Sequence, residues 1–102
     1  MEKRKPHYCL VEIQSHVRTV GVAAFTITAR KNGLAMGLTT SEMVDVVGAL
    51  TQGCFFKSMT THADPRLWQD VYHATVPGGK VAYIKVTAFI DGRPPVIQFK
   101  EK

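Results

Sequence analysis

A small set of polar residues in the second half of the chain has the chemistry to bind and cleave a phosphodiester. The set is Lys57, Gln69, His73 and Tyr83. RNA cleavage without a metal needs a base to activate the 2′-OH, a cation for the charge that develops on the phosphorane, and an acid for the leaving 5′-oxygen. Lys57 would supply the charge, Tyr83 or a histidine the proton transfer, and Gln69 a neutral hydrogen-bond donor.

Two predicted strands carry the first three of these residues. Period-2 alternation over Cys54–Thr60 places on one face Phe55, Lys57, Met59 and Thr61, so that a cation and a thioether lie side by side. Over Leu67–Thr75 the same alternation separates two sets, namely Leu67, Gln69, Val71 and His73 from Trp68, Asp70 and Tyr72. Alternation alone does not fix which of these two sets faces inward.

A third predicted strand, Lys80–Ile90, is the most informative. Its apolar face consists of Ala82, Ile84, Val86, Ala88 and Ile90, and its other face of Tyr83, Lys85 and Thr87. Tyr83 is therefore expected to point away from the core, beside Lys85. With a fourth strand over Val96–Lys100 and short turn-rich connections, the second half predicts an antiparallel meander. If Gln69 and His73 face the same way as Lys57 and Tyr83, the sheet presents one polar cluster with Met59 among it.

The first half of the chain predicts the helices that pack on this sheet. Pro6 suits the first position of a helix whose apolar stripe is Leu10, Ile13 and Val17, which would put His7 in its first turn, either solvated or aimed into a site. Between Arg18 and Leu38 the pattern is weak: Val20–Phe25 is compatible with a short strand, and either Thr26 or Thr28 with the cap of a short helix. A capping box, Thr39–Glu42, opens an amphipathic helix in which Met43 belongs to the core, and Gly53 ends this helical region.

Length and composition favour one α+β domain over residues 1–102. The chain has 45% hydrophobic and 21% charged residues, as ordinary globular domains do. It contains no apolar run of membrane-spanning length and no export signal, so a cytoplasmic protein is expected. The formal net charge of +5 favours polyanionic partners.

The sequence gives little support for a metal or an organic cofactor. Cys9 and Cys54 are far apart and are expected to be buried thiols. The pairs His7-x-Cys9 and His62-x-Asp64 match no familiar metal site, and phosphate-loop, dinucleotide and nucleophile-elbow motifs are lacking. A simpler interpretation also remains open, in which Lys57 and Lys85 are solvated and Tyr83 is a half-buried sheet residue.

Several segments, in the same order along the whole chain, closely resemble the MqsR (motility quorum-sensing regulator) family of type II toxin–antitoxin ribonucleases. They are the N-terminal Met-Glu-Lys-Arg-x-Pro-His, Phe-x-Lys-Ser-Met-Thr-Thr ending at Thr61, Trp-Gln-Asp-Val-Tyr from Trp68, Tyr-x-Lys from Tyr83, and the terminal Phe-Lys-Glu-Lys. The resemblance implies a RelE-like fold, a sequence-selective mRNA endonuclease that needs no metal, and a cognate antitoxin protein.

The resemblance also implies roles for individual residues. It makes Lys57, Gln69 and Tyr83 catalytic, and His7 and Met59 accessory. The chain departs from the family at His73, where an arginine is expected, so that a permanent cation becomes a titratable group. It also departs in the Pro77–Gly79 loop, which is about one residue longer, and between Arg18 and Leu38. His73 and Lys85 stay candidates for RNA contacts.

Two other kinds of function fit the same residues. A non-catalytic RNA-binding regulator would use the basic face to grip phosphates. A protein-interaction partner would instead present this face to an acidic antitoxin.

Overall fold

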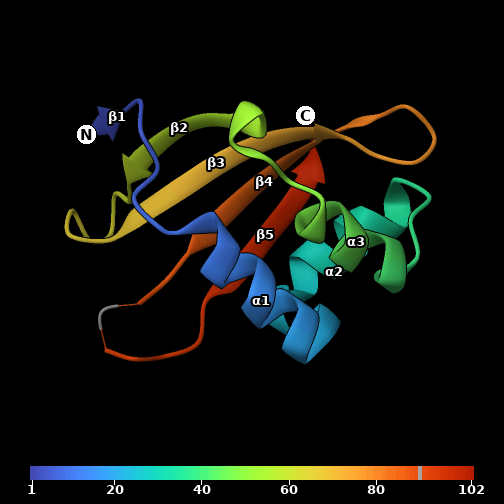
Figure 1. The fold of residues 1–102 in the computed structure, drawn as a ribbon, viewed down its shortest axis with the longest axis horizontal. Coiled ribbons are helices and arrows are strands. Elements are labelled where there is room, and N and C mark those ends of the chain that lie inside the picture. Colours follow the sequence, from blue (N-terminus) through green and yellow to red (C-terminus); the bar gives the residue numbers. More distant parts are fainter. Residues whose placement is uncertain (90) are drawn as a thin grey trace.

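The computed structural model describes residues 1–89 and 91–102, and within them it places an antiparallel five-stranded sheet against helices (Figure 1). The strands are β1 (Glu2–Lys3), β2 (Phe55–Thr60), β3 (Trp68–Thr75), β4 (Val81–Thr87) and β5 (Val96–Glu101). They lie in sequence order, so the predicted α+β meander is confirmed. β4 ends at Thr87, short of the predicted end, and Ile90 lies outside the described residues.

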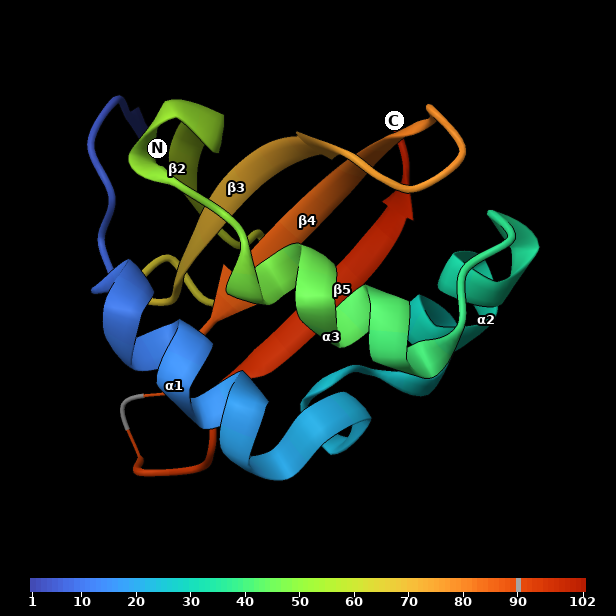
Figure 2. The ribbon, with the colours of Figure 1, turned by 45° about the vertical axis from the view of Figure 1, so that its right-hand side comes forward.

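The helices α1 (Leu10–Val20) and α3 (Thr40–Gly48) cross one face of the sheet, and α2 (Ile27–Ala35) lies beside β5 (Figures 1 and 2). We call the covered side the helix face and the opposite side the outer face. The core lies at the helix face and takes its largest buried side chains from Met43, Tyr72, Ile84, Ile97 and Phe99. The apolar alternation predicted for β4 is confirmed as far as Val86, since Ala82, Ile84 and Val86 are at most 1% exposed.

The N-terminal helix starts later than the sequence predicts. α1 begins at Leu10, so Pro6 and His7 lie before the helix and not in its first turn. The reason is a tertiary contact: the backbone N–H groups of His7 and Tyr8 donate to the Asp70 carboxylate at 2.9–3.0 Å. The buried Asp70 carboxylate thus satisfies these two backbone N–H groups while the segment is not helical.

The weakly patterned stretch between α1 and α3 forms helical turns. Gly21, with φ of 66°, ends α1, and Gly21–Ala24 form a 3₁₀ turn in place of the short strand with which the sequence is compatible. Only Phe25 has a sheet-like contact, a parallel bridge to Ile97. Of the two possible caps for α2, Thr26 is the one used, since its hydroxyl accepts from the backbone N–H of Ala29.

The best-defined helix in the sequence is confirmed. Thr39 and Glu42 form the capping box of α3 in both directions, with distances of 3.1 and 2.9 Å. Met43 is fully buried and has its predicted place in the core. The helix itself ends at Gly48, before a 3₁₀ turn over Gln52–Cys54, so Gly53 does not terminate it.

A close approach between α2 and α3 gives a stability prediction. A Cβ atom added to Gly33 would meet Met43 Sδ and, at 2.9 Å, Met43 Cγ. Because Met43 is fully buried and cannot swing into solvent, we expect Gly33→Ala to lower the free energy of unfolding by about 1–3 kcal/mol. In Gly48→Ala the nearest neighbour is the flexible Arg18 guanidinium at 3.4 Å, so this control should be neutral or slightly stabilising. Urea denaturation of both variants measures the difference.

Both cysteines are free thiols, and the prediction that they are buried is wrong. Cys9 is exposed and Cys54 is half-buried. No helix in the described ranges has the length and apolar character needed to span a membrane.

Candidate active site on the outer sheet face

The strand register arranges the outer face in three rows of facing residues. The first row is Glu2, Met59, Gln69 and Thr87, the middle row is Lys57, Val71, Lys85 and Gln98, and the third row is His73, Tyr83 and Lys100. Cross-strand partners in an antiparallel sheet point to the same side. The structure therefore brings Lys57, Met59, Gln69, His73, Tyr83 and Lys85 onto one face, as the alternation allowed.

A β-bulge changes which residues of β2 share this face. Phe55 is paired with Tyr72 and Lys57 with Val71, so Phe56 is an extra residue on β2. Phe55 consequently packs against Tyr72 on the helix face, and its predicted place beside Lys57 is wrong. Phe56 instead lies on the outer face and stacks on the His73 ring, with 4.5 Å between centroids. A bulge of this kind shifts the side-chain alternation by one residue.

Lys57 is held at the start of the middle row by a carboxylate from β1. Its Nζ donates to Glu2 Oε2 at 2.9 Å, and its side chain is 21% exposed. The hydrogen bond and charge of Lys57 lower the pKa of Glu2. Lys57 is thus an oriented ammonium group at the edge of the site.

The Gln69 amide is also held in place. Its Nε2 donates to the Thr87 hydroxyl across β3 and β4 at 3.2 Å, and Thr87 is buried. Because that contact uses one amide hydrogen, the other hydrogen and the carbonyl oxygen stay available to a ligand. Met59 lies opposite Gln69, half-buried.

The third row is a stack of rings with a cation above it. His73 lies between Phe56 and Tyr83, whose ring centroid is 5.4 Å away, and Lys100 Nζ lies 5.1 Å from the Tyr83 centroid. The buried His73 Nε2 has no hydrogen-bond partner within the described residues. Burial first, and then the charge of Lys102, lower the pKa of His73. The site therefore holds a neutral imidazole beside Tyr83 at neutral pH.

The lowered pKa of His73 predicts a pH dependence of stability. In the unfolded chain a histidine takes up a proton near its ordinary pKa of 6.5, whereas His73 in the folded protein takes up its proton only at lower pH. The proton therefore favours the unfolded state, and we expect the free energy of unfolding to fall as the pH drops from about 7 to 5. His73→Phe, which keeps a ring in the stack, should make this fall shallower, and replacing the exposed His62 serves as the control. Equal slopes for wild type and His73→Phe would contradict the prediction.

His7 lies away from the other predicted site residues. Its ring stacks on Trp68 at 5.3 Å, and its Nδ1 is 2.8 Å from Lys3 Nζ, which itself lies over the Trp68 ring. Trp68 and Lys3 point to the helix face, because they alternate with Gln69 and Glu2. Burial and then Lys3 lower the pKa of His7. An accessory contribution of His7 would therefore have to come from the helix face, on the other side of the sheet from Lys57, Gln69 and Tyr83.

The spacing of the rows limits what the site can bind. Adjacent strands are about 4.8 Å apart and successive rows roughly 7 Å apart, so Gln69 and Tyr83 are separated by roughly two rows. Between them lie Lys57 and Lys85, on either side of Val71, which is fully buried although it is on the outer face. A substrate that touches all four side chains must be extended, as a single strand of RNA is. Within the described residues, no three His, Cys, Asp or Glu side chains are grouped to hold a metal ion.

Sequence reasoning missed three residues of this face. Glu2 pairs with Lys57, Phe56 stacks on His73, and Lys100 lies over Tyr83. Thr87, which accepts from Gln69, lies on the face that alternation predicted for it. Alternation could have found Lys100, because it follows from pairing Val96–Lys100 with the preceding strand. Glu2 had no such signal, since a strand of two residues leaves no periodic pattern.

The fold and the outer face define a small basic α+β protein whose sheet gathers cations, an amide and a tyrosine suited to a phosphodiester. The protein-family description "Motility quorum-sensing regulator, toxin of MqsA" matches the chain over residues 5–101. The chain is also similar to the mRNA interferase toxin MqsR of Escherichia coli (strain K12), with 38% identity over 102 residues, which is 100% of each chain. It therefore belongs to the MqsR toxin family, and the resemblance seen in the sequence is confirmed.

Proposed function

We propose that this protein is an mRNA endoribonuclease that acts as the toxin of a type II toxin–antitoxin system. Family membership supports the class of activity, and the relative of known name is an mRNA interferase. The observation on this chain that carries the proposal is the shared outer face of Lys57, Gln69 and Tyr83. Residues 1–102 would act as one ribonuclease domain, since one core cluster joins α1, α2 and α3 to the sheet.

The proposed reaction is attack of the 2′-oxygen on the neighbouring phosphorus, without a metal ion or other cofactor. The P–O5′ bond breaks as the 2′-O–P bond forms, leaving a 2′,3′-cyclic phosphate and a 5′-OH end. The 2′-OH proton passes to solvent water, and we assign to Tyr83 the role of the acid whose hydroxyl donates a proton to the 5′-oxygen and is then reprotonated from solvent. Lys57 stabilises the charge on the phosphorane, and the Gln69 amide holds phosphate or ribose.

The middle row fits the scissile phosphate best. A phosphate above Val71 would have Lys57 on one side and Lys85 on the other, with Gln69 and Tyr83 beyond it in opposite directions. Binding would replace the Glu2 carboxylate as the partner of the Lys57 ammonium group. Met59 and His73 would contact the neighbouring nucleotides.

Cleavage of a long transcript by the purified protein tests the proposal. We expect discrete cuts with 5′-OH ends, in the presence of a chelator as well as in its absence. A salt-sensitive mobility shift without cuts would identify the protein as an RNA-binding regulator instead. Cleavage that is abolished by the chelator and restored only by a divalent ion would overturn the proposed mechanism.

The proposed partners are cytoplasmic mRNA and a cognate antitoxin protein. Expression of the chain alone is expected to arrest growth, and coexpression of the antitoxin to relieve the arrest. Arrest that persists in a Lys57→Ala variant would favour the remaining alternative, a protein-interaction partner that needs no catalysis.

A further inference from the structure

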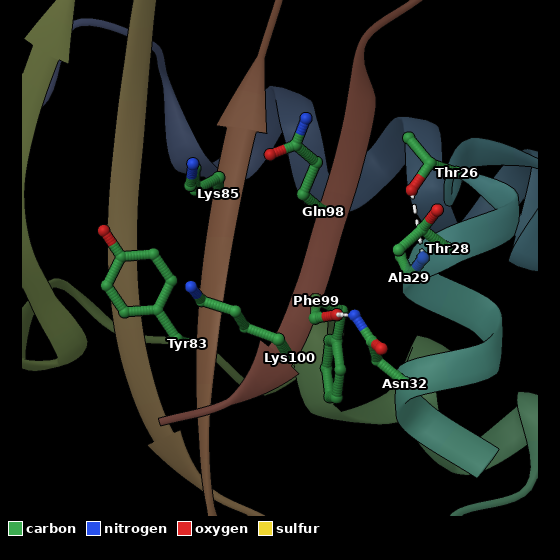
Figure 3. Close-up of a pocket in the computed structure, with 9 residues that line it drawn as sticks. All are labelled: Thr26, Thr28, Ala29, Asn32, Tyr83, Lys85, Gln98, Phe99 and Lys100. Carbon is green, nitrogen blue, oxygen red and sulfur yellow. Dashed lines mark hydrogen bonds between the residues drawn. The ribbon is translucent and has the colours of Figure 1, made fainter. Parts of the chain in front are cut away.

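A hollow of about 400 Å³ lies beside the proposed catalytic residues, between α2 and the outer face of β4 and β5 (Figure 3). Its polar lining includes Thr28, Asn32, Tyr83, Lys85, Gln98 and Lys100. Gln98 extends the middle row and Lys100 the third row, so the hollow continues both rows past β4. Its volume falls in the range of about 300–1,000 Å³ that is usual for small-molecule sites.

The two ends of the hollow differ in charge. Figure 3 shows Lys100 extending toward Tyr83 on one side and the α2 residues Thr28 and Asn32 on the other. In the described part of the chain, neither Lys85 nor Lys100 has a carboxylate as a salt-bridge partner. One end is therefore cationic, and the end against α2 is polar but uncharged.

We propose that this hollow is the subsite for one nucleotide of the RNA next to the scissile phosphate, a proposal that rests on the proposed ribonuclease function. Its phosphate lies at Lys85 and Lys100, and its base lies against Thr28, Asn32 and Gln98. A nucleotide has the same division into an anionic end and a polar, uncharged end. Specific RNA recognition usually takes single-stranded bases and reads their edges by hydrogen bonds.

The hydrogen-bonding state of the lining supports this orientation. The Thr26 hydroxyl is occupied by the cap of α2, whereas Thr28 is exposed beside it. Asn32 Nδ2 donates to the Phe99 carbonyl at 2.9 Å, which fixes the amide and leaves its oxygen as an acceptor. Gln98 adds a second amide. The uncharged end thus offers both donors and acceptors to a base.

The charges of Lys85 and Lys100 suit the cationic end of the hollow to a phosphate. Lys85 and Lys100 come from diagonal positions on β4 and β5, since Lys85 pairs with Gln98 and Lys100 with Tyr83. Burial and then the charge of Lys100 lower the pKa of Lys85. A phosphate between the two ammonium groups would offset their repulsion and raise the pKa of Lys85. Lys85 would then serve both the scissile phosphate and the next one along the strand.

Binding of mononucleotides to the whole protein tests the subsite without cleavage. We would titrate AMP, CMP, GMP, UMP and inorganic phosphate separately and follow the backbone amide signals by NMR. Thr28→Val and Gln98→Leu remove hydrogen-bonding groups from the base end, and Thr40→Val, at the exposed start of α3, is the matched control. We expect at least one nucleotide to shift the signals of Thr28, Asn32 and Gln98, with about fivefold or weaker binding in both variants and none of this loss in the control.

The outcomes separate this subsite from the proposed function. Phosphate that binds as tightly as every nucleotide, or nucleotides that leave the α2 signals unchanged, would overturn the subsite. In cleavage assays, Thr28→Val and Gln98→Leu should change the preference between bases at one flanking position by about fivefold while cuts persist. An unchanged preference would also overturn it. Nucleotide binding without any RNA cleavage by the wild type would overturn the ribonuclease function but not the nucleotide site.

Discussion

Lys57→Ala is expected to lower kcat/KM for RNA cleavage at least about 100-fold, because a positioned charge that acts on the transition state contributes this much or more. The group is already oriented in the free protein, since Glu2 holds its Nζ at 2.9 Å and only 21% of the side chain is exposed. No reorganisation of the lysine is then needed when the phosphate replaces the carboxylate. Lys57→Arg keeps the charge and should retain more activity than the alanine variant.

A lysine in the connection just before β4 provides the control. Lys80 pairs with Glu101 at 3.5 Å, and both side chains are about half exposed, so Lys80→Ala should leave cleavage and folding nearly unchanged. Tyr83→Phe removes only the hydroxyl and keeps the ring that contacts His73 and Lys100, so its expected loss of about tenfold or more would report proton transfer alone. Unchanged cleavage in a folded Lys57→Ala or Tyr83→Phe variant would remove that residue from the site.

The sequence predicted the β2–β5 meander and most of the outer face because each rests on alternation along strands of six to eight residues. Gln69, His73, Tyr83 and Lys85 lie where a period of two places them. The same rule failed at Phe55, because the bulge at Phe56 adds one residue to β2. Nothing in Cys54–Lys57 signals that extra residue, since both phenylalanines suit either side of a half-buried strand.

The N-terminal residues could not be placed from local sequence. Pro6 is compatible with the start of a helix, yet no helix forms before Leu10, because a carboxylate more than sixty residues away accepts hydrogen bonds from the His7 and Tyr8 backbone. His7 is carried to the helix face by this contact. A prediction based on helix signals has no access to such a long-range partner, and for the same reason it missed the pair of Glu2 with Lys57.

Asp70→Ala is expected to be the most destabilising of the substitutions considered, lowering the free energy of unfolding by about 3 kcal/mol or more. The Asp70 side chain is 1% exposed and accepts from the backbone N–H groups of His7 and Tyr8 and, at 2.7 Å, from the Ser58 hydroxyl. Alanine would leave these donors without their acceptor in a buried place. By the usual scaling for domains of this size, the melting temperature should fall by roughly 12 °C or more.

Two further variants identify the cause of that loss. Asp70→Asn keeps one acceptor oxygen and should lose less stability than alanine, whereas Asp91→Ala removes an exposed carboxylate paired with Arg93 and should change stability by less than about 0.5 kcal/mol. Asp70 is next to Gln69 on β3, and it anchors His7 and Tyr8, which follow the strand that contains Glu2. We therefore expect the alanine variant to make the outer face more mobile as well. Hydrogen exchange would show this as faster exchange at the His7 and Tyr8 amides, and native-like protection there would contradict the anchoring role.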